Sequence, residues 1–288
     1  ILEGDDDNDV LIGDSAPPPL YVMDEGSGSI LKVGFGGGVS EIAVSADEIK
    51  DFTGEDDVKL KDQGIALDGD GNMFFTENES HTILMKPAGG GPIQEIANQE
   101  DFKEITGNSG TKPDGITIGS DGQLYVTDGA KESVFSVNPV SGEIEQVVSK
   151  SDLKDLLEDL GNDDVSVNLH AGIVAGTDGM IYTVSDGKPD AIFAVNSATG
   201  ETSVLASGDP FKDLDVYMTV APNGDLIVAD DKTDTIYRIE TSGENTGDVS
   251  EFLSEDDLEA ITGRDVDLEG GVTFDPAGNF YVAEENTD

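Results

Sequence analysis

Apolar and polar positions repeat along most of the chain, and the best-preserved part is a pair of short apolar runs joined by a turn. The turn holds a glycine, and the second run ends in a carboxylate. Self-similarity at a spacing of roughly 45–57 residues is typical of a β-propeller. Copies of the unit occupy residues 64–78, 115–129, 172–186, 218–231 and 271–285, and a copy of the second run, LYVMDE, lies at residues 20–25.

The turns predict tight β-hairpins, because Asx-Gly pairs readily adopt the positive φ that such turns need. The flanking runs are rich in Val, Ile, Tyr and Phe, as strands are. A third and a fourth apolar run follow in most copies, so the unit is a four-stranded antiparallel blade. The pairs are Asp70-Gly71, Asp121-Gly122, Asp178-Gly179 and Asn223-Gly224.

A short helix is expected after the fourth strand of most blades, the alternative being an irregular acidic loop. Ser or Asn is followed three residues later by an acid, as in a capping box. A glycine stop of the kind found past helix ends follows in three copies. The copy at residues 207–214 is shorter and lacks the stop. The capping positions are Ser45, Asn98, Ser149 and Ser254, and the stops are Gly54, Gly107 and Gly263.

The six second strands predict a six-bladed, all-β propeller with short inter-blade helices. The last copy stops after its second strand, at Asp288, and the chain begins at Ile1. We therefore expect both ends to be cuts in a longer polypeptide and the last blade to be completed in cis or in trans. An unpaired strand edge could pair with another chain, so self-association is a further expectation.

The charge balance excludes several classes of partner. Asp and Glu number 62 against 15 Lys and Arg, which gives a net charge of −47. Nucleic acid binding needs clustered cations, and anionic membranes would repel this surface. No stretch approaches 18 apolar residues, so we expect no membrane insertion. Such self-repulsion favours calcium-rich or salty surroundings, although solubility alone is the other explanation. The absence of Cys excludes disulfides and thiol chemistry.

The first residues, LEGDDDNDVLIGD at 2–14, resemble the calcium-binding nonapeptide of RTX (repeats-in-toxin) proteins. The resemblance implies Ca²⁺ bound between successive repeat turns and a secreted bacterial protein, extracellular or at the cell surface. It divides the chain into an RTX-like remnant with a Pro-rich linker at 1–19 and a propeller at 20–288. Alternatively, residues 9–15 form the first strand of the first blade. The implied calcium ligands are Asp5, Asp7, Asn8 and Asp9.

The segments GNMFFTENESHTI at 71–83 and PDGITIGSDGQLYVTD at 113–128 resemble NHL-repeat, virginiamycin B lyase-like and regucalcin/gluconolactonase-like propellers. In the gluconolactonase-like enzymes, acid and Asn side chains that precede the innermost strands hold a central divalent metal. Only Asp114 keeps a ligand type at the matching positions, so a lactonase activity is not expected from these residues. The matching positions are Gln63, Asp114, Ala171, Tyr217 and Gly270.

Histidine and the recurring carboxylates are the other candidates for chemistry. The lyase-like enzymes use His and Glu near a metal, and His170, near the start of a central strand, is the better of two histidines; the alternative is a structural histidine. No Ser-His-Asp set can be assembled. The acids that end the second strands form either a cation-binding ring, with Asp128 as a metal candidate beside Asp114, or a turn device. These acids are Asp24, Glu77, Asp128, Asp186, Asp230 and Glu284.

The segment Asp68-Gly-Asp70-Gly-Asn72 resembles the start of a calcium loop, but it stands where other copies carry an ordinary turn. The whole sequence predicts a non-enzymatic binding or structural module of a larger secreted, calcium-associated surface or matrix protein. Its partners would be calcium and an extracellular protein or polysaccharide. A metal-dependent hydrolase or lyase in the central channel and a self-assembling filament or surface-layer subunit are the alternatives.

Overall fold

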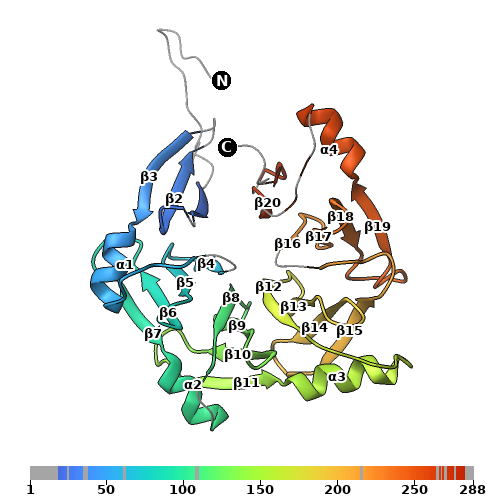
Figure 1. Cartoon of the computed structure of the whole chain (residues 1–288), viewed down its shortest axis with the longest axis horizontal. Coiled ribbons are helices and arrows are strands. Elements are labelled where there is room, and N and C mark those ends of the chain that lie inside the picture. The colour runs from blue at the N-terminus through green and yellow to red at the C-terminus, as the bar shows by residue number, and fades with distance from the viewer. Residues whose placement is uncertain are drawn as a thin grey trace, which may run out of the picture.

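The chain forms an all-β propeller with four short helices in its described part (Figure 1). The computed structural model describes residues 19–24, 26–34, 38–60, 63–107, 110–214, 217–263, 266, 268, 271–275 and 277–282. The sheets stand around a common axis, with the first strands innermost and the helices at the perimeter. No helix in these parts of the chain has the length and apolar character that spanning a membrane requires.

Four sheets have four antiparallel strands each, which follow one another in chain order from the axis outward. Short hairpins join neighbouring strands, as the repeat predicts. The second sheet contains β4 (Ile65–Leu67), β5 (Met73–Glu77), β6 (Thr82–Lys86) and β7 (Gln94–Ala97). The third contains β8 (Pro113–Ile118), β9 (Leu124–Asp128), β10 (Ser133–Val137) and β11 (Ile144–Val148). The fourth contains β12 (Leu169–Ala175), β13 (Met180–Ser185), β14 (Ala191–Asn196) and β15 (Thr202–Ser207). The fifth contains β16 (Met218–Val220), β17 (Leu226–Asp230), β18 (Thr235–Ile239) and β19 (Val249–Leu253).

The first and last sheets are smaller, and they correct the blade count. The first sheet has three strands, β1 (Leu20–Asp24), β2 (Ser29–Gly34) and β3 (Gly38–Val44), and the last has two, β20 (Val272–Phe274) and β21 (Phe280–Val282). The described residues thus form five blades, and the prediction of six is wrong for them. Counting second strands overstated the number, because the last copy adds only a hairpin here.

Close contact between inner strands requires glycine at one point near the axis. Gly64 precedes β4, and a Cβ atom there would lie 2.3 Å from the backbone nitrogen of Ile116 in β8. Its N–H donates to the carbonyl oxygen of Asp114 at 3.0 Å, so the two sheets are joined through their backbones. The glycine that opens this copy of the repeat therefore reflects packing between blades.

The four helices confirm the predicted capping signals. Ser149 caps α3 (Lys150–Asp159), and Asp152 completes a capping box. Gly54, Gly107 and Gly263 adopt left-handed conformations after three of the helices, as Gly does at such stops. The connection at 207–214, predicted without a stop, contains no helix. The other helices are α1 (Ala46–Thr53), α2 (Gln99–Thr106) and α4 (Glu255–Thr262).

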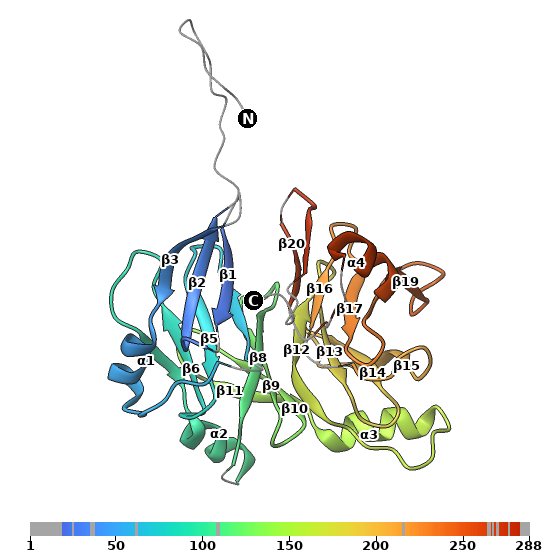
Figure 2. The same ribbon diagram turned by 45° about the horizontal axis from the view of Figure 1, so that its top comes forward.

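The hydrophobic core lies between successive sheets rather than at one centre. Each of five clusters combines side chains from one sheet with those of the next, from the first sheet to the β20–β21 hairpin. Among the described residues, no cluster joins that hairpin to the first sheet. Figures 1 and 2 show β1–β3 and β20 on the two sides of an opening in the ring.

Candidate functional site

Two of the carboxylates that end the second strands, Asp230 and Glu77, act as clamps between loops. Asp230 is fully buried, and its Oδ2 accepts hydrogen bonds from the N–H groups of Lys212, at 2.7 Å, and Asp213, at 3.2 Å. Its Oδ1 accepts from the N–H of Thr233 at 3.1 Å. Glu77 makes the same kind of contact, since its Oε1 accepts from the N–H of Lys59 at 3.0 Å. In the second and fifth sheets these bonds match the turn alternative and hold the loop that enters the blade against the loop that follows the second strand.

In the fourth sheet the clamp is Ser185 rather than Asp186. Strand β13 ends at Ser185, whose Oγ accepts from the N–H groups of Asn168, at 3.0 Å, and Gly187, at 3.2 Å. Ser185 has the same spacing from the turn glycine Gly179 as Asp128 has from Gly122 in the copy at 115–129, so serine replaces the acid at this position. Asp186 is the residue after the strand end, where the copy at 115–129 has Gly129, so its assignment as a strand-ending acid was wrong. Asp186 is left beside His170.

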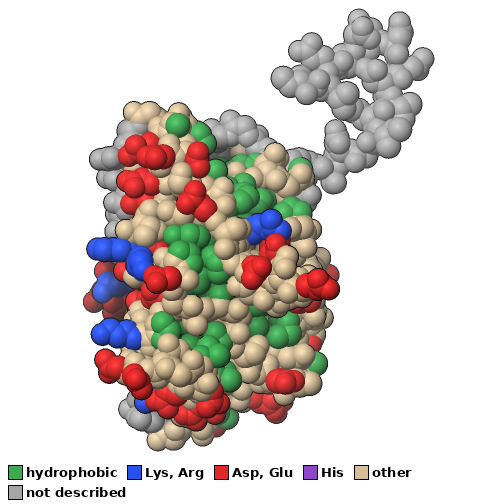
Figure 3. Space-filling model, turned by 90° about the vertical axis from the view of Figure 1, so that its right-hand side faces the viewer, with side chains coloured by type: hydrophobic (Ala, Val, Ile, Leu, Met, Phe, Trp, Pro, Cys, Tyr) green, Lys and Arg blue, Asp and Glu red, His purple; other side chains and the backbone are tan. Residues whose placement is uncertain are grey.

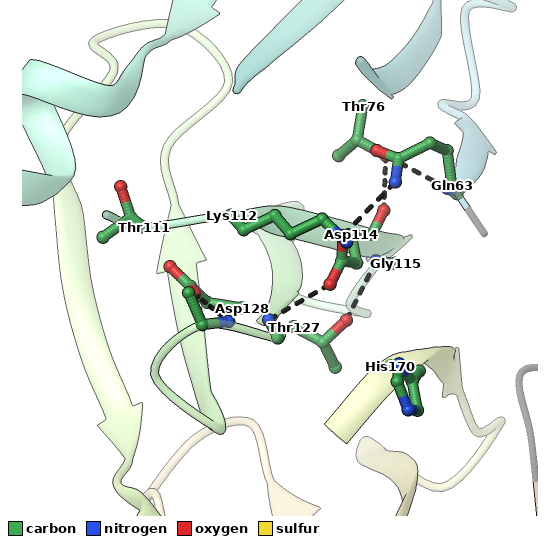
Figure 4. Close-up of polar contacts among 12 residues, drawn as sticks. Gln63, Thr76, Thr111, Lys112, Asp114, Gly115, Thr127, Asp128 and His170 are labelled. Atoms are coloured by element: carbon green, nitrogen blue, oxygen red, sulfur yellow. Dashed lines mark hydrogen bonds and ion pairs between the residues drawn. The ribbon is translucent and has the colours of Figure 1, made fainter. Parts of the chain in front are cut away.

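Asp114 lies at the inner edge of the third sheet, in contact with hydrogen-bond donors (Figure 4). It is 2% exposed, and its Oδ1 lies 3.3 Å from both the Lys112 ammonium and Nε2 of Gln63. Its Oδ2 accepts from the N–H of Gly129 at 3.2 Å. Burial raises the pKa of Asp114, although Lys112 opposes the shift. The ammonium takes a place that a divalent cation would need, so this group does not fit the metal that the gluconolactonase-like resemblance implies.

Asp128 is close enough for the charge of Asp114 to affect its ionisation. It is fully buried at the end of β9, and burial raises its pKa. Its Oδ1 accepts from the N–H groups of Ala130, at 2.9 Å, and Lys131, at 3.0 Å. Within the described residues, no group of three or more His, Cys, Asp or Glu side chains is arranged to hold a metal. Asp128 therefore has the contacts of a turn residue.

His170 stands apart from Asp114 and Asp128, on β12 (Figure 4). Its Nε2 lies 3.6 Å from Oδ2 of Asp186 and 3.0 Å from Nδ2 of Asn168. Burial alone would raise the pKa of Asp186, but the hydrogen bond and charge of His170 lower it. The His170 side chain is 37% exposed, so it forms an accessible His–Asp pair.

Next to this pair, an open groove of about 540 Å³ lies between two loops. One loop joins β13 to β14, and the other joins β15 to β16. The second loop is short and has no helix, unlike the connections that contain α1–α4. Buried Asp230 fixes that loop through its bonds to Lys212 and Asp213. The charged side chains that line the groove are Asp186, Lys188, Asp190, Asp209, Lys212 and Asp213.

Like charges make the groove electrostatically unfavourable. Burial, with the charges of Asp213, Asp230 and Asp186, raises the pKa of Asp190 to about 6. Burial and the charges of Asp186 and Asp230 also raise the pKa of Asp213. The ammonium group of Lys212 forms an ion pair with Asp209, so its positive charge neutralises Asp209 more than the other acids of the groove. A cation placed among Asp186, Asp190 and Asp213 would relieve this repulsion.

The calcium-like segment at 68–72 has the contacts of a turn. Oδ1 of Asp68 accepts from the N–H groups of Asp70, at 2.9 Å, and Asn72, at 2.8 Å, and Oδ2 accepts from the Asn72 amide at 2.7 Å. Although burial alone would raise it, these bonds lower the pKa of Asp68. The predicted RTX-like ligands Asp5, Asp7, Asn8 and Asp9 lie outside the described residues.

Solved structures of other propellers resemble this chain in fold. A streptogramin B lyase aligns at 19% identity and a TM-score of 0.61, over 92% of this chain and 72% of the lyase. Nidogen, in a complex with laminin, aligns at 14% identity and a TM-score of 0.62, over 93% of this chain and 86% of the nidogen chain. A gluconolactonase from Xanthomonas campestris aligns at 11% identity and a TM-score of 0.54, over 94% of this chain and 81% of the gluconolactonase. Such identities show the propeller fold alone. No protein-family model matches the chain, and no curated protein sequence does.

Sequence reasoning missed Asp190 and Asp213, which belong to the groove. The repeat drew attention to positions that recur in every copy, whereas these acids stand in loops that differ between copies. A usable signal was present in the shortened connection at 207–214. Without a helix, that connection leaves room for a groove beside the preceding blade.

Proposed function

We propose that this chain is a non-enzymatic binding module that recognises a cationic group of an extracellular partner. The ligand would enter the groove between the β13–β14 and β15–β16 loops. The nidogen–laminin complex supports the proposal only as an example of the same fold in a protein that binds another. Loop-built faces on a rigid ring of blades suit recognition.

The crowding of three carboxylates around one open groove is the observation that supports the proposal. Asp190 has a pKa of about 6 because burial and neighbouring acids disfavour its charge. A lysine or arginine side chain would neutralise that charge and recover part of the repulsion. Arginine is favoured, because its planar donors can engage two carboxylates together.

The proposed setting is a larger secreted bacterial protein that works in the presence of calcium. The net charge of −47 supports this proposal, because counter-cations would offset the self-repulsion of the folded chain. The RTX-like segment at 1–19 would add calcium sites through further repeats.

The test is isothermal titration with a short arginine-containing peptide in 150 mM NaCl. We expect Asp190→Asn/Asp213→Asn to weaken binding by about tenfold or more, because each carboxylate contributes a charge-assisted contact. The matched control is Glu143→Gln/Glu145→Gln, which changes the net charge equally at two exposed positions of the third sheet. Its affinity should stay within about twofold of the parent.

Equal losses in the two double variants would contradict the proposal, because general attraction to an acidic surface would then explain the binding. Undetectable binding by the parent chain would contradict it as well. Circular dichroism melting curves of all three proteins would show whether a change in affinity comes from a change in folding.

A second candidate function is a lyase or hydrolase activity that uses His170. The accessible His170–Asp186 pair at 3.6 Å is the observation that favours it. Turnover on lactone, ester or cyclic-ester substrates, lost in His170→Ala but retained in the Asp190→Asn/Asp213→Asn variant, would rank this candidate first. The binding proposal predicts no such turnover.

A further inference from the structure

One face of the first sheet is apolar and has no packing partner among the described residues. Directly paired side chains point to the same side of a sheet. Leu20 pairs with Val33, Val22 with Leu31, and Leu31 with Ile42, so these five residues share a face. We call it the leading face. None of the five belongs to a hydrophobic cluster, whereas Tyr21 and Met23, on the opposite face, pack toward the second sheet.

The other sheets show what a leading face contacts. In the third sheet the pair that corresponds to Val22 and Leu31 is Val126 and Phe135, both fully buried against the second sheet. Val22 is instead 43% exposed. The leading face thus has the apolar composition of a blade-to-blade interface, but no neighbouring sheet among the described residues packs against it.

Ile42 makes the face more apolar than the repeat requires. It is 60% exposed on the outer strand. The residues in the same register in the second, third and fifth sheets are polar, namely Glu95, Gln146 and Glu251. In the fourth sheet the residue in this register is Val204, which packs against the core shared with the third sheet. An apolar residue at this position is therefore either packed against a neighbouring surface, like Val204, or, like Ile42, exposed and open to contact with one.

The β20–β21 hairpin carries the matching half of such an interface, which we call the trailing face. Thr273 pairs with Tyr281, as Thr117 pairs with Tyr125 in the third sheet. Tyr125 is 2% exposed and packs toward the fourth sheet. Tyr281, like Tyr125, donates to a carboxylate of the preceding turn, Oδ2 of Asp275 at 3.1 Å, but it lies outside every cluster.

We infer that the leading face of one copy of this chain binds the trailing face of a second copy, head to tail. The two faces are halves of the interface that recurs between all neighbouring sheets, so they are complementary. An opening separates the two faces of one chain, so contact between them would require neighbouring sheets to shift against at least one buried core. Close-packed cores resist such a change. A heterologous contact of this kind leaves one leading face and one trailing face free at the two ends of a dimer. Further copies can therefore add to the assembly.

The high negative charge makes this association dependent on screening. Two copies repel each other at low ionic strength, and salt or calcium shortens the range of that repulsion. Sedimentation velocity at 1 M NaCl over a range of protein concentrations is therefore the measurement. We expect monomers at the lowest concentration and dimers and larger species as the concentration rises.

Single substitutions to Glu test the two faces with the same change in charge. Val22→Glu and Thr273→Glu should each raise the Kd of association by about tenfold or more. Val140→Glu is the matched control, because Val140 is 94% exposed on the turn between β10 and β11, away from both faces. It should associate like the parent chain. Circular dichroism melting confirms that each variant is folded.

Mixing the two interface variants identifies the geometry. Each retains one intact face, so an equimolar mixture should form dimers that do not grow further. The inference is overturned if the parent is monomeric at all concentrations, as when residues 1–18 or the hairpin of the same chain cover the leading face. It is also overturned if Thr273→Glu assembles normally, which would indicate two leading faces in contact.

Discussion

At the residue scale, the same carboxylate can stabilise the fold or oppose it, depending on its partners. Asp230 and Glu77 are buried but accept hydrogen bonds from several N–H groups, which compensates for burial. Asp190 lies among other acids, and its pKa is raised to about 6. The groove therefore contains carboxylates that cost stability, as binding sites often do.

The ionisation of Asp190 gives a prediction about stability and pH. Its folded pKa of about 6 exceeds the ordinary value of about 3.9 for an unfolded chain, so the folded state binds the proton more tightly. The ionised form thus destabilises the fold above pH 6, and this penalty disappears as pH falls through 6 toward 4. At pH 7.5 we expect Asp190→Asn to raise the free energy of unfolding by roughly 1 kcal/mol, after allowing for solvent screening at a partly exposed site.

Urea denaturation at pH 7.5 and pH 4.5 measures this effect. The stability difference between Asp190→Asn and the parent should shrink at the lower pH. For the exposed control Glu143→Gln, the difference should remain small at both values. A difference for Asp190→Asn that is unchanged by pH would contradict the assigned electrostatics.

At the scale of elements, the sequence predicted what local chemistry determines. Asx-Gly turns specified the hairpins, and Ser or Asn caps with Gly stops specified the helices. The clamp at Ser185 was missed because the next residue, Asp186, is an acid and was taken for the strand end, although Ser185 has the same spacing from Gly179 as Asp128 has from Gly122. The groove also escaped prediction, since it depends on two loops whose sequences differ from one copy of the repeat to the next. The Lys112 contact to Asp114 likewise depends on side-chain positions that the sequence does not fix.

Gly64 tests the contact between inner strands. Gly64→Ala places a Cβ 2.3 Å from the nitrogen of Ile116, and backbone cannot move aside easily. We expect a loss of about 2–3 kcal/mol in the free energy of unfolding, as for overpacking of a dense core. Gly69→Ala is the control, because a Cβ at Gly69 would have no atom within 4 Å. Chemical denaturation that gives equal stabilities for both variants would contradict the described approach of β4 and β8.

At the scale of the whole molecule, stability depends on stacked sheet-to-sheet cores and on charge. Each core joins two neighbouring sheets, so the propeller resembles a repeat protein bent into a ring. The sequence predicted the fold because the repeat is regular. It misjudged the number of blades because the last copy forms only a two-stranded sheet in the described part of the chain. Acidic side chains are spread over the face shown in Figure 3, and most of the cationic ones on this face lie along one edge.

The charge gives a prediction about cations. Raising NaCl from 0.05 to 0.5 M should raise the Tm by several degrees, because salt screens the self-repulsion of a chain with a net charge of −47. If calcium also binds at defined sites, CaCl2 should raise the Tm further than MgCl2 at equal ionic strength, and a chelator should reverse the difference. Equal effects of the two salts would contradict the calcium proposal.

The binding proposal is tested most directly by hydrogen–deuterium exchange of the parent chain with and without the arginine-containing peptide. The account predicts that the peptide slows exchange at residues 186–190 and 208–213, the two loops that form the groove. The third sheet, with exposed Glu143 and Glu145, should exchange as before. Protection spread over the acidic outer helices, or confined to β8 and β9 around Asp114, would contradict the assignment of the groove as the binding site.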